Sequence, residues 1–271
     1  MYLDVYTVGD GVSAFFDSTK QAVMLYSHNG TLWPDWLEKM NIPHQLVKTI
    51  KVASGTVRLP QDARGYVETA SLHFYFQLFG GLTNLQTIDM SKFDTSGVVN
   101  MRTMFMGCTS IKKMDFNKND ISMVQSMSHM FSQCCALREV NMGKCRTPDL
   151  QDISGMFYSC GKLSRFDAKN LDTSNVFDMH SMFFDCESLE NLNLSNFDTK
   201  KTEHMNEMFS GCVGLKELDL SSFDTTSVID MSLMFAGCAK LTTIKFAPIV
   251  RPETNTSMVF AGCPLNIAIG A

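Results

Sequence analysis

Apolar and polar positions recur along this chain every 26 residues, the interval from Met104 to Met130 that every later copy repeats. The most regular element is a Met-Phe-x-x-Cys box. The boxes begin at Met104, Met130, Met156, Met182, Met208 and Met234. A fixed period of this length over several copies is typical of a solenoid, in which each block packs only against its neighbours.

Each box is followed by three apolar columns in an L-x-x-L-x-L pattern, as at Leu215, Leu218 and Leu220. The last two columns alternate with polar residues, as a strand with one buried face does. A second phrase, Phe-Asp-Thr-Ser at residues 93–96, follows the strand, and an aliphatic and a Met column come next. We therefore expect one strand per block on one side, with a short strand, turn or 3₁₀ segment on the other and the Met and Phe columns inside.

The full string L-x-x-L-D-L-S-x-F-D-T-S-x-V-x-x-M-x-x-M-F-x-G-C resembles the repeat of BspA-like leucine-rich-repeat surface proteins of bacteria, and residues 215–238 match it almost letter for letter. The resemblance covers residues 76–263. It implies a β-rich, right-handed solenoid of about seven such repeats. It also implies a protein at the cell surface, secreted or carried on a virion.

Residues 1–75 do not follow the period and are predicted to form an N-terminal cap of short strands, with turns at Gly9–Gly11 and Asn29-Gly30. A helical segment is expected at Asp35–Met40, and residues 47–52 alternate as a first rung would. Residues 264–271 are predicted to form a terminal strand. The first unit of a solenoid exposes apolar surface, so Trp33 and Trp36 are interpreted as its cover; a carbohydrate-stacking platform is the alternative.

The net charge of −5 disfavours a nucleic-acid-binding protein, which usually carries a basic stripe. The sequence contains no apolar stretch long enough for a transmembrane helix, and its first residues lack the pattern of a signal peptide. We therefore expect no membrane insertion, and the compartment stays open between the cell surface, secretion and a virion. Six of the nine cysteines occupy one column, and Cys263 continues it one residue early, which predicts a ladder of buried free thiols rather than disulfides or a zinc site.

Chemistry at the repeated aspartates has two interpretations. The Asp of each Phe-Asp-Thr-Ser phrase, such as Asp94, Asp198 and Asp224, forms a column that could bind calcium. The same residues are typical of a turn in which the carboxylate accepts a backbone N–H two residues on. One Asp per block favours the turn, so no metal or other cofactor is expected. No nucleophile, P-loop or dinucleotide motif appears, and the histidines fall in no recognisable site, so an enzyme is not expected.

The polar positions of the predicted strands vary from copy to copy and are expected to form an exposed face of mixed charge. The residues predicted to contact a partner are Lys112, Lys113, Asp115, Arg138, Arg165, Asp167, Glu190 and Asp219. Solenoids use such extended faces for binding. We predict an adhesion-type protein, bacterial or phage-borne, that recognises a host or neighbouring protein or a glycan. The alternative is an assembly component, such as a particle decoration protein, that makes its contacts through the solenoid ends. A monomer would favour the binding protein and a closed oligomer the assembly component, and the sequence leaves the oligomeric state open.

Overall fold

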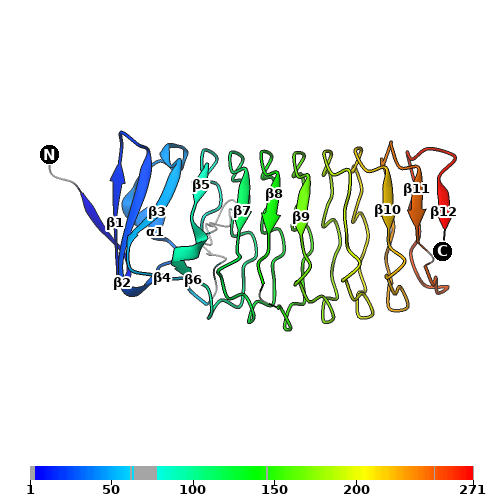
Figure 1. Ribbon diagram of the computed structural model, residues 1–271, viewed down its shortest axis with the longest axis horizontal. Coiled ribbons are helices and arrows are strands. Elements are labelled where there is room, and N and C mark those ends of the chain that lie inside the picture. The colour runs from blue at the N-terminus through cyan, green and yellow to red at the C-terminus, as the bar shows by residue number, and fades with distance from the viewer. Residues whose placement is uncertain (1–3, 62, 64–77, 145, 247, 271) are drawn as a thin grey trace, which may run out of the picture.

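The computed structural model describes residues 4–61, 63, 78–144, 146–246 and 248–270. The chain forms a solenoid of about nine turns with about 26 residues per turn. Figure 1 shows these turns side by side from the N-terminal to the C-terminal end. The predicted solenoid class is confirmed. The turns outnumber the roughly seven 26-residue repeats because the stacking of strands begins in the N-terminal cap, before the periodic sequence does.

The extra turns lie near the N-terminus. Strand β2 (Ala22–Leu32) pairs in parallel with β3 (Thr49–Ser54), and β3 pairs in parallel with β5 (Thr87–Ile88). On the opposite edge of the turn, β2 pairs with β4 (Val57–Arg58) and β4 with β6 (Phe93–Asp94). The first rung predicted at residues 47–52 is therefore confirmed. The boundary predicted at residues 75/76 lies outside the described residues.

The turns predicted at Gly9–Gly11 and Asn29-Gly30 are wrong. Strand β1 (Val5–Asp17) runs through the first and β2 runs through the second, and the two form one long antiparallel hairpin with an irregular register between Asp10 and Val12. The glycines serve close approach of the two strands: a Cβ on Gly30 would lie on top of the Asp10 carbonyl oxygen. Glycine permits such contacts at a bulge as readily as in a turn, and the sequence does not distinguish them.

A short helix, α1 (Trp36–Met40), follows the hairpin as predicted, and a 3₁₀ turn, η1 (His44–Leu46), comes next. Trp36 is fully buried, donates from Nε1 to the Leu78 carbonyl at 2.9 Å and packs edge-on against Phe79. Its role as a cover of the stack is confirmed. Trp33 is half-buried and points its Nε1 at Asp10 Oδ1, 3.3 Å away.

The repeats contribute short parallel strands to one face, with equivalent residues paired one turn apart. A 3₁₀ turn, η2 (Met90–Lys92), precedes β6. The strands are β7 (Lys113–Asp115), β8 (Glu139–Asn141), β9 (Arg165–Asp167), β10 (Glu217–Asp219), β11 (Thr243–Lys245) and β12 (Ala268–Gly270). They form two separate three-stranded sheets, β7-β8-β9 and β10-β11-β12. On another side, a ladder of isolated parallel bridges joins the turns from Asn100 through Asp178 to Asn255. The boxes also bond from turn to turn, as Phe105 N does to the Met130 carbonyl at 2.9 Å.

The interior is a continuous ladder of aromatic rings. The Phe of every box stacks on the Phe one turn away, with centroids 5.2–5.7 Å apart from Phe79 to Phe260. The cysteine column lies beside it, and each thiol donates to a Phe carbonyl in a neighbouring turn, as Cys186 Sγ does to Phe157 at 3.3 Å. The predicted thiol ladder is confirmed for the six box cysteines, which are fully buried; Cys263 is only half-buried.

These thiols should resist alkylation in the folded protein. Burial raises the pKa of Cys108 and of Cys238 to about 12, so almost no thiolate is present near neutral pH. With iodoacetamide and no denaturant, exposed Cys135 should react first and the six buried thiols only after unfolding. Peptide mass spectrometry over time assigns each site. Labelling of the box cysteines as fast as that of Cys135 would contradict the ladder.

Turns of the solenoid are closed by short polar side chains. The Asp of the Phe-Asp-Thr-Ser phrase accepts the backbone N–H two residues on, at 3.1 Å for Asp94 and 2.9 Å for Asp224. The predicted turn role is therefore confirmed. The same arrangement recurs at the end of each strand, as in Asp115, and in the bridge ladder, as in Asp230. Each complete turn thus has several places where a carboxylate or amide fixes a change of direction.

Candidate functional site

The eight residues predicted to contact a partner are all exposed, and they lie on or beside the strands. Lys113 and Asp115 are in β7, Arg165 and Asp167 in β9, and Asp219 in β10. Lys112 and Arg138 directly precede β7 and β8, and Glu190 occupies the equivalent position in the turn between β9 and β10. We call this surface, from β7 to β11, the strand face.

Several charges on the strand face are paired across turns. Glu139 in β8 lies between two cations, 2.9 Å from Lys113 Nζ and 3.6 Å from an Arg165 Nη atom. The Lys113 ammonium lowers the pKa of Glu139. Two further pairs, Lys216–Glu190 at 3.6 Å and Lys245–Asp219 at 2.9 Å, complete the pattern. The cations Lys113 and Arg165 therefore have an acid between them, which weakens their combined positive field.

Three of the predicted contact residues also hold the backbone. Asp115, Asp167 and Asp219 each accept, through Oδ1, the N–H of the residue two positions on. Hydrogen bonds from Ser221, with Lys245 close by, lower the pKa of Asp219 to about 2. These side chains shape the turn that follows the strand and leave their other oxygen for a neighbouring turn or a partner. Their replacement would therefore disturb the local fold as well as any binding.

The strand ladder is interrupted between β9 and β10. Elsewhere the backbone bonds regularly from turn to turn, as Arg138 N does to the Lys112 carbonyl at 2.8 Å. Within the described chain, residues 190–193 form no backbone hydrogen bond to either neighbouring turn. Figure 1 shows this rung as a plain coil between two sheets. The backbone N–H and C=O groups of this rung therefore lack the turn-to-turn partners that the neighbouring rungs have.

A shallow groove of about 1000 Å³ lies over this interruption and extends from β8 to β11. Its floor includes the half-buried Phe166 and Leu192. Its rim is polar and rich in amides. The rim residues are Glu139, Asn141, Ser164, Arg165, Asp167, Lys169, Asn191, Asn193, Ser195, Asn196, Glu217, Asp219 and Lys245. Of the predicted residues, Arg165, Asp167 and Asp219 line this groove, whereas Lys112 and Lys113 line a separate hollow beside β5 and β7.

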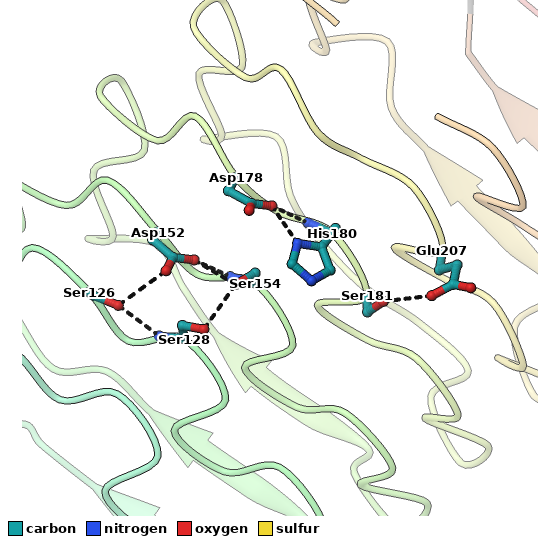
Figure 2. A network of polar contacts seen from close by, with 8 residues as sticks. All are labelled: Ser126, Ser128, Asp152, Ser154, Asp178, His180, Ser181 and Glu207. Carbon is teal, nitrogen blue, oxygen red and sulfur yellow. Dashed lines mark hydrogen bonds and ion pairs between the residues drawn. The ribbon is translucent and has the colours of Figure 1, made fainter. Parts of the chain in front are cut away.

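A second polar surface, which the sequence interpretation missed, follows the bridge ladder. Figure 2 shows its network: Asp152 accepts from Ser126 and Ser154, Ser128 and Ser154 share a hydrogen bond, and Ser181 donates to Glu207 at 2.9 Å. We call this surface the back face. The residues of the back face recur one turn apart, and this spacing is a signal that could have identified the surface. Their residue types differ from copy to copy, however, so they form no sequence motif.

His180 is the most closely held titratable group of the back face. Its Nδ1 lies 2.7 Å from Asp178 Oδ1, which also accepts the His180 backbone N–H. The hydrogen bond to Asp178 raises the pKa of His180, whereas burial and nearby Arg102 lower the pKa of His129. The two histidines therefore differ in charge over a range of pH although they lie in the same part of the surface.

His129 explains why one position in the left-handed column is glycine. Thr103, Ser181 and Glu207 adopt φ of 57°, 52° and 58°, so the backbone there tolerates side chains. A Cβ on Gly155 would lie 2.2 Å from His129 Cε1, however, because the imidazole fills that space.

Gly155→Ala should therefore destabilise the fold by about 1–2 kcal/mol, as overpacking does. In the double variant with His129→Ala, most of this cost should disappear. Urea unfolding of the four proteins in a double-mutant cycle measures the coupling. An equal cost with and without the imidazole would assign the effect to the backbone instead.

Neither surface has the ligands of a metal centre. Within the described ranges, no group of three or more His, Cys, Asp or Glu is arranged to hold a metal ion. No helix of the described residues is long and apolar enough to cross a membrane.

Comparison with known proteins identifies the repeat. A family model described as "Mycoplasma protein of unknown function, DUF285" matches residues 65–165 and 151–265. A solved leucine-rich-repeat protein of Leptospira interrogans aligns over 83% of this chain at 12% identity, with a TM-score of 0.33, and this chain spans only 61% of it. A leucine-rich-repeat protein of Bacteroides ovatus aligns over 100% of this chain and 90% of its own at 17% identity, with a TM-score of 0.30. No curated protein matches.

Proposed function

Because this chain belongs to the DUF285 family, whose repeats are of the BspA-like leucine-rich-repeat type, we propose that it is a non-enzymatic binding protein that recognises a protein or glycan partner through its strand face. The observation that carries the proposal is the coincidence of the groove with the interrupted ladder. A regular strand face offers only side chains, whereas this one also offers unpaired backbone groups at its centre.

The chemistry of the groove favours a polar, extended ligand. Asn191 and Asn193 are exposed at its centre and present amide donors and acceptors, with Phe166 and Leu192 forming a small apolar floor. Glycan hydroxyls and peptide groups both use such mixed surfaces. The paired charges around the groove favour recognition by hydrogen bonds rather than by long-range attraction, so binding should depend only weakly on salt.

The test is binding of the full chain to a panel of immobilised glycans and envelope proteins, with a variant that fills the groove. Asn191→Arg adds bulk at an exposed position outside the core and leaves in place Asn193, whose Oδ1 accepts the Ser195 N–H. A matched control, Gln125→Arg, adds the same charge at an exposed position beside the bridge ladder. We expect a ligand whose affinity falls at least about tenfold in the groove variant and is unchanged in the control.

An equal loss in both variants would contradict a site in the groove. A panel without any ligand, together with a closed oligomer in gel filtration, would favour the assembly role instead. If the protein is a monomer and the groove variant still binds the ligand, the binding function would be retained but its site would lie outside the groove.

A further inference from the structure

The back face carries an aromatic stack that stops abruptly. The residue after each Met-Phe pair forms a column that is half-buried except at Ser132, which is buried. It reads Met106, Ser132, Tyr158, Phe184, Ser210 and Ala236. Tyr158 and Phe184 stack face to face, with centroids 4.6 Å apart and planes within 3°. His129 lies against the other side of Tyr158 at 6.3 Å. In the next turn the column holds only Ser210, and among the described residues Tyr158 is the one ring that stacks on Phe184.

Two carboxylates flank the ring face of Phe184 opposite Tyr158. Asp185 follows Phe184, and its N–H donates to the Ser210 carbonyl at 2.8 Å, so the two turns meet here. Its Oδ1 occupies the space that a Cβ on Gly211 would take, and its side chain has no hydrogen bond or ion pair to any described residue. Burial and nearby Glu187 raise its pKa. Glu207 belongs to the same turn as Ser210 and accepts from Ser181 (Figure 2).

The charge balance of the two faces differs. On the strand face, Glu139, Glu190 and Asp219 each have a Lys or Arg within ion-pair distance. On the back face, Asp178 pairs with the His180 imidazole at 2.7 Å, whereas no described Lys or Arg forms an ion pair with Asp185 or Glu207. Burial disfavours the charged form of a carboxylate that has no cation beside it. A cation from a partner would therefore be bound favourably at this surface.

We propose that Phe184, Asp185, Glu207 and Ser210 form a receptor for an arginine side chain on a basic segment of a partner protein. The guanidinium would stack on the open face of Phe184, above the small Ser210, as the next plane of the Tyr158–Phe184 stack. Its N–H groups would donate to Asp185 and Glu207. Arginine fits better than lysine because its planar group can stack on a ring and donate in several directions at once.

The site lies on a different surface from the groove and is independent of it. The probe is a fluorescein-labelled hexa-arginine peptide, with hexalysine as its counterpart, and binding of the full chain is followed by fluorescence anisotropy at physiological salt. Asp185→Asn with Glu207→Gln removes both carboxylates at constant shape. Phe184→Ser introduces the residue that the following turn already has at this position. Glu190→Gln with Glu217→Gln removes the same charge from the strand face as a control. Thermal unfolding verifies that each variant is folded.

The wild-type chain should bind the arginine peptide about tenfold more tightly than the lysine peptide. The carboxylate variant should lose most of the affinity for both peptides, and Phe184→Ser should remove the preference for arginine. The strand-face control should bind as the wild type does. Equal affinity of the wild type for both peptides would overturn the proposal, as would an equal loss in the control or the absence of binding.

Discussion

Phe183→Ala is expected to lower the free energy of unfolding by about 3–5 kcal/mol, the usual cost of removing a buried Phe side chain. Phe183 is fully buried and stacks on Phe157 at 5.6 Å and on Phe209 at 5.7 Å. In a solenoid each turn packs only against its neighbours, so a cavity in a central turn weakens both of its interfaces at once. Urea unfolding followed by circular dichroism measures the loss.

The next residue is the matched control for this prediction. Phe184→Ala makes the same chemical change one position along the chain, but Phe184 is half-buried and stacks only on Tyr158. Phe184→Ala should lower the free energy of unfolding by about 1 kcal/mol, because it removes one aromatic pair and only part of a ring's buried apolar area. Equal losses at the two positions would show that the ring ladder is not what holds neighbouring turns together.

The repeat phase explains why the core could be predicted from sequence. A column of identical residue types, such as the Phe of the boxes, can be buried in every copy only if every turn has the same shape. Once one copy is interpreted correctly, the burial of the equivalent residues in all other copies follows. The same argument predicted the turn role of Asp94 and Asp224, which the hydrogen bonds confirm. The prediction of the core thus rests on the regular spacing of many residues and not on any single residue.

Prediction was weakest where regularity ends. Gly9 and Gly30 are compatible with a turn or with a bulge in a long hairpin, and only the pairing of β1 with β2 decides between them. The missing hydrogen bonds at residues 190–193 have no local cause in the sequence, since Leu189 and Leu192 continue their columns. The back face escaped detection because its residue types differ from copy to copy. Asp178 and His180 meet within one turn, whereas Ser181 and Glu207 meet only through the stacking of adjacent turns.

The two faces therefore differ in how their polar groups are satisfied. Strand-face charges are neutralised by partners one turn away, as in Lys245–Asp219, which leaves amides and backbone groups as the available chemistry. Back-face carboxylates hold hydroxyl groups, backbone N–H groups and, at Asp178, the His180 imidazole, but no Lys or Arg among the described residues. A chain built from one repeat can thus present two surfaces of different chemistry, because substitutions at exposed phases do not disturb the shared core.

Thr199→Val is expected to destabilise the protein by about 2–3 kcal/mol, although the two side chains have nearly the same shape. Thr199 is fully buried, and its hydroxyl makes two bonds to one residue of the next turn. Oγ1 donates to the Asp224 carbonyl at 2.8 Å and accepts the Asp224 N–H at 2.8 Å. Valine would leave both backbone groups without a partner in a place where the turns meet. Thr173 bonds to Asp198 in the same way, so the hydroxyl column acts as a second seam between turns.

Two controls separate the hydroxyl from the packing. Thr199→Ser keeps the hydroxyl and loses one methyl group, so it should cost only about 1 kcal/mol. Thr202→Val removes a buried hydroxyl that donates one hydrogen bond, 3.0 Å long, to the Val176 carbonyl, and its cost should be about half that of Thr199→Val. Chemical denaturation of the three variants gives the order directly. A Thr199→Val protein as stable as the wild type would mean that water or a shift of the turn satisfies Asp224, and that the aromatic ladder alone holds this side of the stack.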